Sequence, residues 1–186
     1  RDRDCTSIHH VKSHNEIVNV WSSEYPNSLG LFYSAITDFL GFAVNEGEYK
    51  MMGLASFGEP KYYDVLSKTI KFENKKLEIN TKYYDYVRRT DRSYSDLLAD
   101  ELGVKPRRPD IPFEVGTEDF KIYANVAASA QKLLEDLLFA IFKYAHELTG
   151  EKNFLFSGGV AMNSSAVRKT ANLDFIEKLN LPPSPG

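Results

Sequence analysis

A two-glycine turn at the end of an apolar run is the clearest candidate for chemistry in this sequence. The large apolar residues 154–156 stop at Ser157-Gly158-Gly159, and a pattern of apolar and small residues begins at Val160. This pattern predicts a buried strand, a turn and the start of a helix. Glycines in such a turn let a phosphate approach backbone N–H groups beside a positively polarised helix N-terminus. An ordinary tight turn is an equally good interpretation of the pattern alone.

The residues after the turn narrow the choice of nucleotide motif. No Gly-Lys-Ser/Thr follows Gly159, so the turn is not a Walker loop, and the spacing is not G-x-G-x-x-G. Asn163 lies one turn into the predicted helix, where its amide could face whatever the glycines hold. Taken by itself, Asn163 is better interpreted as a solvent-facing helix residue.

Two further polar clusters are candidates for binding. In the stretch 46–50, Lys50 suits an anionic oxygen and Glu48 suits a hydroxyl or ribose, although a solvated loop is the simpler interpretation. Lys105, Arg107 and Arg108 form a basic cluster that is either solvated or in contact with a phosphate or a neighbouring domain.

The elements that position these residues follow from the spacing of apolar side chains. Residues 6–11 and 16–21 predict an antiparallel strand pair, and residues 29–42 predict a helix capped by Asn27 or Ser28. The longest helical pattern runs from 117 to about 148 and ends at Gly150, with small residues crowding 124–130 where another backbone should pack closely. Shorter elements are expected as helices at 51–55, 62–70 and 93–102, the last capped by Ser93, and as a hairpin over 70–79.

This order of elements predicts an α/β fold. A long helix leads into a strand, a glycine turn and another helix, and the uninterrupted apolar strand suits a sheet covered on both faces. Residues 60–116 carry small elements of their own and are expected to be an insertion.

Composition limits the classes of partner. The 186 residues suffice for one domain or one and a part, and the net charge of −3 without a basic block argues against a nucleic-acid partner. No apolar run approaches the roughly 20 residues that a membrane span needs. A single cysteine excludes an intramolecular disulfide and fits a cytoplasmic location.

Several stretches, in order, resemble the NodU/CmcH family of O-carbamoyltransferases. The order and spacing agree with the family from about residue 15 onward. The matching stretches are 28–35 (SLGLFYSA), 47–55 (GEYKMMGLA), 106–109 (PRRP), 127–131 (AASAQ) and 157–163 (SGGVAMN).

The resemblance implies a Kae1-like domain of the actin-like ATPase (ASKHA, ribonuclease H-like) fold. In this family a YrdC-like domain makes carbamoyl-adenylate from carbamoyl phosphate and ATP. The Kae1-like domain then transfers the carbamoyl group to a hydroxyl of a small molecule such as a sugar or an antibiotic, with the help of a divalent metal, expected to be iron. Matched by motif, the nucleotide or carbamoyl-adenylate site comprises Ser157, Gly158, Gly159 and Asn163, with Gly47, Glu48 and Lys50 lining the same cleft.

The sequence departs from the family pattern at the metal. The family's His-x-x-x-His motif is expected upstream of Arg1, and its Asp ligand after Gly186. His10 and His14 have the right spacing but fall in the predicted strand pair, so no metal role is assigned to them. We therefore expect a fragment of the Kae1-like domain that lacks transferase activity by itself.

Two other interpretations remain open at this point. A non-catalytic ASKHA-type nucleotide-binding or interaction module would also lack metal ligands. A tRNA-modifying Kae1-like protein is disfavoured by the absence of a basic block and by the GEYKMMG stretch. No residue pattern identifies the acceptor alcohol.

Overall fold

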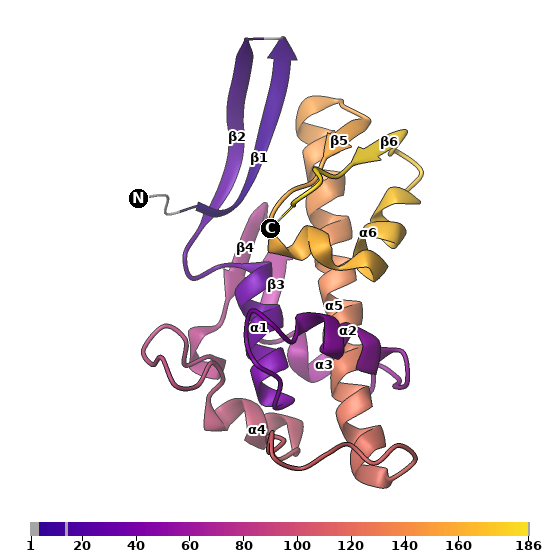
Figure 1. Ribbon diagram of the computed structural model, residues 1–186. Coiled ribbons are helices and arrows are strands. Elements are labelled where there is room, and N and C mark those ends of the chain that lie inside the picture. The colour runs from indigo at the N-terminus through magenta and orange to yellow at the C-terminus, as the bar shows by residue number, and fades with distance from the viewer. Residues whose placement is uncertain (1–3, 14, 186) are drawn as a thin grey trace.

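A computed structural model describes residues 4–13 and 15–185, so His14 lies outside the described residues. The protein is a mixed α/β structure in which three two-stranded sheets lie on one half of a helical body (Figure 1). Its longest element is helix α5 (Glu118–Thr149), and the elements labelled α1, α2, α3, α6 and β3 pack along it. The predicted α/β class is confirmed.

The N-terminal strand pair is confirmed as a hairpin that projects from the body (Figure 1). Strand β1 (Asp4–Ser13) pairs antiparallel with β2 (Glu16–Glu24). Trp21 joins the hairpin to the body, because its ring packs edge-on against Phe72 and Tyr144 and its indole N–H donates to the carbonyl of Lys75 at 2.8 Å.

Helix α1 (Leu29–Phe39) begins where the sequence predicts a cap. The Oγ of Ser28 accepts the backbone N–H of Leu31 at 3.3 Å, which satisfies one of the unpaired donors of the first turn. Phe32, Ile36 and Phe39 recur at helical spacing and are fully buried in the core.

Close backbone packing on the first half of α5 is confirmed at Gly58. This glycine follows α2 (Glu48–Ala55), and a Cβ built on it would overlap the carbonyl group of Ala124. Polar side chains of α5 fix the same approach: the Oδ1 of Asn125 accepts the N–H of Glu59 at 2.8 Å, and the Oγ of Ser129 accepts that of Tyr62 at 2.9 Å.

The segment 60–116 carries its own small elements and shares the core of the rest of the chain. Leu66, Ile70, Tyr84 and Leu98 from this segment are buried in the same cluster as α1 and α5. Its elements are α3 (Tyr63–Leu66), the antiparallel hairpin of β3 (Ile70–Glu73) and β4 (Lys76–Ile79), the 3-10 helix η1 (Thr81–Tyr83) and α4 (Asp96–Leu102).

The predicted cap of α4 is wrong. The N-cap residue is Ser95 rather than Ser93, and the Oγ of Ser95 donates to the carbonyl of Lys82 at 2.8 Å instead of capping the helix. Ser93 is held outside the helix because its N–H donates to Asp38 at 2.7 Å and its carbonyl accepts the N–H of Asp85 at 3.0 Å.

The C-terminal part corrects two expectations. Strand β5 (Asn153–Leu155) pairs in parallel with β6 (Lys178–Asn180), but it is not buried on both faces, since Leu155 is 72% exposed. In the described chain its only parallel neighbour is β6, while Phe154 packs on Phe142 of α5. The α-helix does not begin at Val160: a 3-10 helix, η2 (Gly159–Met162), comes first, and α6 (Ser164–Ala171) follows.

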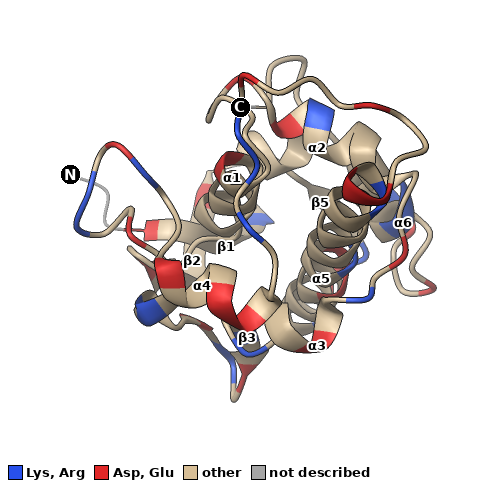
Figure 2. Ribbon diagram, turned by 90° about the horizontal axis from the view of Figure 1, so that it is seen from below, with Lys and Arg blue, Asp and Glu red and all other residues tan. Residues whose placement is uncertain are grey.

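Charged residues are dispersed over the molecule. Lys and Arg positions are interspersed with Asp and Glu around the outside (Figure 2). Among the described helices, none combines the length and apolar character required to cross a membrane.

Candidate functional site

The glycine turn, Ser157-Gly158-Gly159, connects β5 to η2. Gly158 has φ +104° and ψ 165°, a conformation that residues with a Cβ rarely adopt. Its N–H donates to the carbonyl of Pro185, and the Oγ of Ser157 donates to the same oxygen at 3.4 Å. The turn therefore presents donors that converge on one oxygen atom.

Gly159 has no structural requirement for glycine in the described chain. Its φ is not in the left-handed region, and a Cβ built on it would meet no described atom within 4 Å. Neither backbone strain nor packing explains why a side chain is missing here.

The open space beside Gly159 belongs to a cavity of about 820 Å³. One wall is apolar and comes from Leu138, Ile141 and Phe142 of α5, while β1 and the first residues of α1 line other sides. This volume lies within the range of small-molecule and cofactor sites, roughly 300–1,000 Å³. The described lining contains the acidic residues Asp4 and Glu151 and no Lys or Arg, so the donors available to a phosphate here are backbone N–H groups, hydroxyls and the imidazoles of His9 and His10.

The second predicted cluster lies at the first turn of α2, outside the lining of this cavity. The stretch was expected as a loop leading into a helix, but the helix already begins at Glu48. The Glu48 carboxylate accepts three hydrogen bonds. They come from the hydroxyl of Ser34 at 2.7 Å, the N–H of Asn45 at 2.9 Å and the N–H of Gly47 at 3.2 Å. An acidic group is favourable at this helix end. Lys50 is exposed and lies over the ring of Tyr49.

Helix α2 nevertheless contacts the residues that follow the glycine turn. The Oγ of Ser164, the first residue of α6, lies 3.6 Å from the sulfur of Met52. The structure thus brings the 47–55 stretch beside the end of the 157–163 stretch, with Gly47, Glu48 and Lys50 at the N-terminal end of α2.

Asn163 is a buried helix cap, so the solvent-facing interpretation is wrong. The residue is only 8% exposed, and its Oδ1 accepts a hydrogen bond from the N–H of Ala166 at 3.0 Å. The amide also forms a reciprocal pair with Gln131 of α5: Asn163 Nδ2 donates to Oε1 at 2.9 Å, and Gln131 Nε2 donates to Oδ1 at 3.1 Å.

This pair is the centre of a buried polar cluster, which we call the amide network. It consists of Tyr33, Gln131, Glu135 and Asn163, with Ser165 and Lys169 at its edge. Tyr33 donates to Gln131 Oε1 at 2.8 Å, and Gln131 Nε2 donates to Glu135 Oε1 at 2.9 Å. Burial raises the pKa of the Tyr33 phenol, which keeps it protonated and able to donate.

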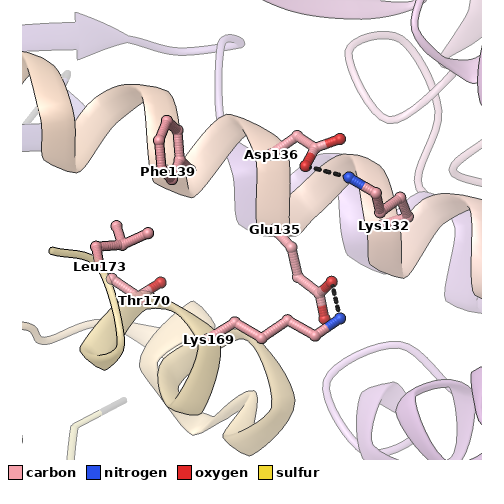
Figure 3. A pocket seen from close by; sticks show the side chains of 7 residues that line it. All are labelled: Lys132, Glu135, Asp136, Phe139, Lys169, Thr170 and Leu173. Carbon is pink, nitrogen blue, oxygen red and sulfur yellow. Dashed lines mark hydrogen bonds and ion pairs between the residues drawn. The ribbon is translucent and has the colours of Figure 1, made fainter.

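The outer end of the network lies at a small cavity of about 160 Å³ between α5 and α6. Figure 3 shows Lys169 reaching from α6 to Glu135, with Nζ 2.5 Å from Oε2. The neighbouring Asp136 points instead to Lys132 on its own helix.

Sequence reasoning did not select Tyr33, Gln131 or Glu135 as site residues. A signal for two of them was present, since Tyr33 and Gln131 lie in the stretches 28–35 and 127–131 that carry the family resemblance. The structure shows that the polar residues of three separate stretches meet at one place.

Arg107 is occupied by the protein itself. Its Nε donates to the carbonyl of Leu40 at 2.7 Å, Nη2 donates to that of Gly41 at 3.3 Å, and the guanidinium lies 4.2 Å from the ring centre of Phe113. Burial lowers the pKa of Arg107 from its ordinary value. These contacts describe a structural clamp rather than a phosphate contact.

The described residues do not fit the metal that the resemblance implies. No group of three or more described His, Cys, Asp or Glu residues could hold a metal ion. His10 lies 3.2 Å from Glu151, which is a single pair at the edge of the large cavity.

The fold and the site describe an α/β domain whose glycine turn opens on a cavity of ligand size. The chain belongs to the carbamoyltransferase family, because the family described as Carbamoyltransferase N-terminus matches residues 5–186. The resemblance predicted from the motifs is confirmed.

Curated relatives agree with this assignment at modest identity. The chain is 35% identical over 157 residues to an uncharacterized protein of Synechocystis sp., covering 82% of this chain and 24% of the relative. It is 30% identical to nodulation protein NolNO of Sinorhizobium fredii and 31% identical to nodulation protein NolO of Bradyrhizobium diazoefficiens, covering 82% of this chain each time. It spans 20% and 25% of those two proteins, so it corresponds to a quarter or less of these relatives' lengths.

Proposed function

We propose that this chain supplies the nucleotide-binding turn of an O-carbamoyltransferase. The proposed ligand is carbamoyl-adenylate, made from carbamoyl phosphate and ATP by a YrdC-like domain of the same full-length protein. The observation that carries the proposal is Gly159, a glycine that nothing in the described chain requires, placed at the wall of a cavity large enough for a nucleotide. Membership of the carbamoyltransferase family supports the choice of reaction.

In this proposal, the chain binds and orients the adenylate. The carbonyl oxygen of Pro185 accepts hydrogen bonds from Ser157 and Gly158. We propose that a ligand oxygen takes the position of this carbonyl oxygen. Because no described Lys or Arg lines the cavity, we assign the phosphate to the backbone N–H groups of the turn. The acceptor hydroxyl oxygen then bonds to the carbamoyl carbon, AMP leaves with the electron pair of the broken C–O bond, and the hydroxyl proton is released. Holding the two reactants in place is the contribution expected of a binding domain.

The finer fold assignment is also part of the proposal. We place the chain in an actin-like (ASKHA, ribonuclease H-like) Kae1-like domain, with residues 60–116 as an insertion. The parallel pair of β5 and β6, packed on α5 through Phe154, supports it. An experimental structure of the full-length protein that lacks an actin-like domain would contradict this placement.

Calorimetric titration with a non-hydrolysable ATP analogue tests the binding site. In Gly159→Val, the branched side chain fills the space beside the turn, and we expect the affinity to fall at least about tenfold. The control is Gly53→Val, because a Cβ there also meets no described atom within 4 Å but Gly53 does not line the cavity. Equal binding by the wild-type chain and Gly159→Val would reject the site.

A carbamoyl-transfer assay distinguishes an O-carbamoyltransferase from a non-catalytic nucleotide-binding module. We expect the isolated chain to release no carbamoylated product above background and the full-length protein to do so. Binding of nucleotide without transfer by the full-length protein would favour the non-catalytic module instead.

A further inference from the structure

The side-chain amides of the amide network can face only one way, and Glu135 determines which atom of Gln131 donates and which accepts. An ionised carboxylate can only accept hydrogen bonds. Glu135 is 8% exposed and accepts from Gln131 Nε2 at 2.9 Å, from Ser165 Oγ at 3.0 Å and from Lys169 Nζ at 2.5 Å. Both oxygens are therefore used, and the pair with Lys169 compensates the buried charge.

The carboxylate determines which way the Gln131 amide faces. Only the Gln131 nitrogen can bond to Glu135, so the amide oxygen must face the opposite side. There it accepts from the Tyr33 hydroxyl at 2.8 Å and from Asn163 Nδ2 at 2.9 Å. A reversed Gln131 would place its oxygen against the carboxylate and its nitrogen against the Nδ2 donor of Asn163.

The direction of Gln131 matches the one that Asn163 needs as a helix cap. The Nε2 of Gln131 takes Asn163 Oδ1 as acceptor, and the same oxygen caps α6 by accepting the N–H of Ala166. A reversed Asn163 would lose this cap, which is the contact that begins α6.

Asn163 lies at the end of the 3-10 turn that begins at Gly159. Its N–H donates to the carbonyl of Val160 at 3.0 Å, and the N–H of Ala161 donates to that of Gly158 at 2.9 Å. The amide of Asn163 and the glycine turn are therefore linked through four residues of hydrogen-bonded backbone.

We propose that Glu135 is a positioning residue that acts through Gln131 and Asn163 to hold the glycine turn in its ligand-binding conformation. This inference rests on the proposed function, because it assigns Glu135 to the support of that same site. Glu135 does not line the large cavity, so it has no contact with a ligand bound there.

The test is a double-mutant cycle on the affinity for the ATP analogue, with Glu135→Gln, Asn163→Ala and the double variant. The glutamine side chain that replaces Glu135 has the same shape but carries a donor as well as an acceptor, so the direction of Gln131 is no longer fixed. We expect each single variant to lose about tenfold in affinity, and the double variant to lose no more than the weaker-binding single variant. Losses that multiply would overturn the inference, because Glu135 would then not act through Asn163.

Asp136→Asn is the matched control, since this neighbour on α5 bonds to Lys132 and Tyr63 instead of the network. Its affinity should equal that of the wild-type chain. If Glu135→Gln also binds as tightly as wild type while Gly159→Val does not, the inference is wrong and the proposed function stands. Should Glu135→Gln fail to fold, Ser165→Ala removes only one partner of the carboxylate and should lower the affinity about twofold.

Side-chain amide signals in ¹⁵N-resolved NMR spectra provide a readout that does not need a ligand. The Asn163 and Gln131 amide signals should shift in Glu135→Gln and stay in place in Asp136→Asn. A wild-type chain that does not bind the analogue would reject the proposed function. Unmoved Asn163 signals in Glu135→Gln would reject the positioning role in every case.

Discussion

Two positions in this protein, Gly58 and Gly159, lack a side chain for opposite reasons. At Gly58 a Cβ would overlap the carbonyl group of Ala124, because the chain leaving α2 crosses the backbone of α5 there. At Gly159 a Cβ would meet no described atom within 4 Å. The first glycine is explained by packing within the chain, whereas the second leaves space that this chain does not fill.

The surroundings of the two glycines differ in the same way. Near Gly58, side chains of α5 bond directly to the crossing backbone, as Asn125 does to Glu59. Near Gly159, the donors of the turn meet only the carbonyl of Pro185 among described atoms, and the polar side chains stand behind the turn in the amide network. The comparison teaches that Gly159, unlike Gly58, is explained by neither packing nor backbone conformation within the described chain.

The largest effect should come from adding a side chain at Gly58, where the two backbones cross closely. We expect Gly58→Ala to destabilise the protein by about 3 kcal/mol or more, because the atoms that its Cβ meets belong to backbone and cannot rotate away. Urea denaturation monitored by circular dichroism measures this change.

Gly103→Ala is the control for this variant. Gly103 has φ +63° but open space around its Cβ, so only backbone strain applies and the cost should be about 1 kcal/mol. If the two variants lost equal stability, the close packing at Gly58 would cost no more than the backbone strain at Gly103, and the comparison would fail.

The second-largest effect should come from Arg107, which packs against another crowded glycine at the C-terminal end of α1. A Cβ on Gly41 would lie 2.7 Å from the carbonyl oxygen of Arg107, whose guanidinium bonds back to Leu40 and Gly41. We expect Arg107→Lys to cost about 2 kcal/mol, since an ammonium lacks the planar fork that bonds to these carbonyls while lying flat on Phe113. The measurement is again the free energy of unfolding in urea.

Arg108→Lys provides the comparison on the adjacent residue. Arg108 is exposed and pairs with Asp110 at the surface, so its denaturation midpoint should not move measurably. A loss at Arg108 as large as that at Arg107 would mean that the whole 105–108 stretch acts as one charged patch.

Local patterns in the sequence predicted the elements well because each depends on neighbours in the chain. The Ser28 cap of α1 and the apolar stripe of α5 are of this kind. The crowding at 124–130 even predicted a crossing backbone, although not that Gly58 supplies it.

The errors came from contacts distant in sequence. Ser93 was a good cap by its neighbours, but Asp38, 55 residues away, holds its N–H. The local pattern predicts an exposed Asn163, but its partner Gln131, which lies 32 residues earlier on a different helix, holds it in the interior. The apolar run at 154–156 predicted burial that only one helix provides in the described chain.

The smallest effect sharpens the comparison most, because it asks whether Gly159 matters to the fold at all. With an ordinary φ and open space, Gly159→Ala should change stability by no more than about 0.5 kcal/mol, and it can stabilise by restricting the unfolded chain. The same variant should still weaken binding of the ATP analogue, because a methyl group occupies the space beside the turn. Denaturation and titration on one preparation check both points. A loss of stability above about 1.5 kcal/mol would show that the fold itself selects glycine here, and Gly159 would then resemble Gly58 rather than differ from it.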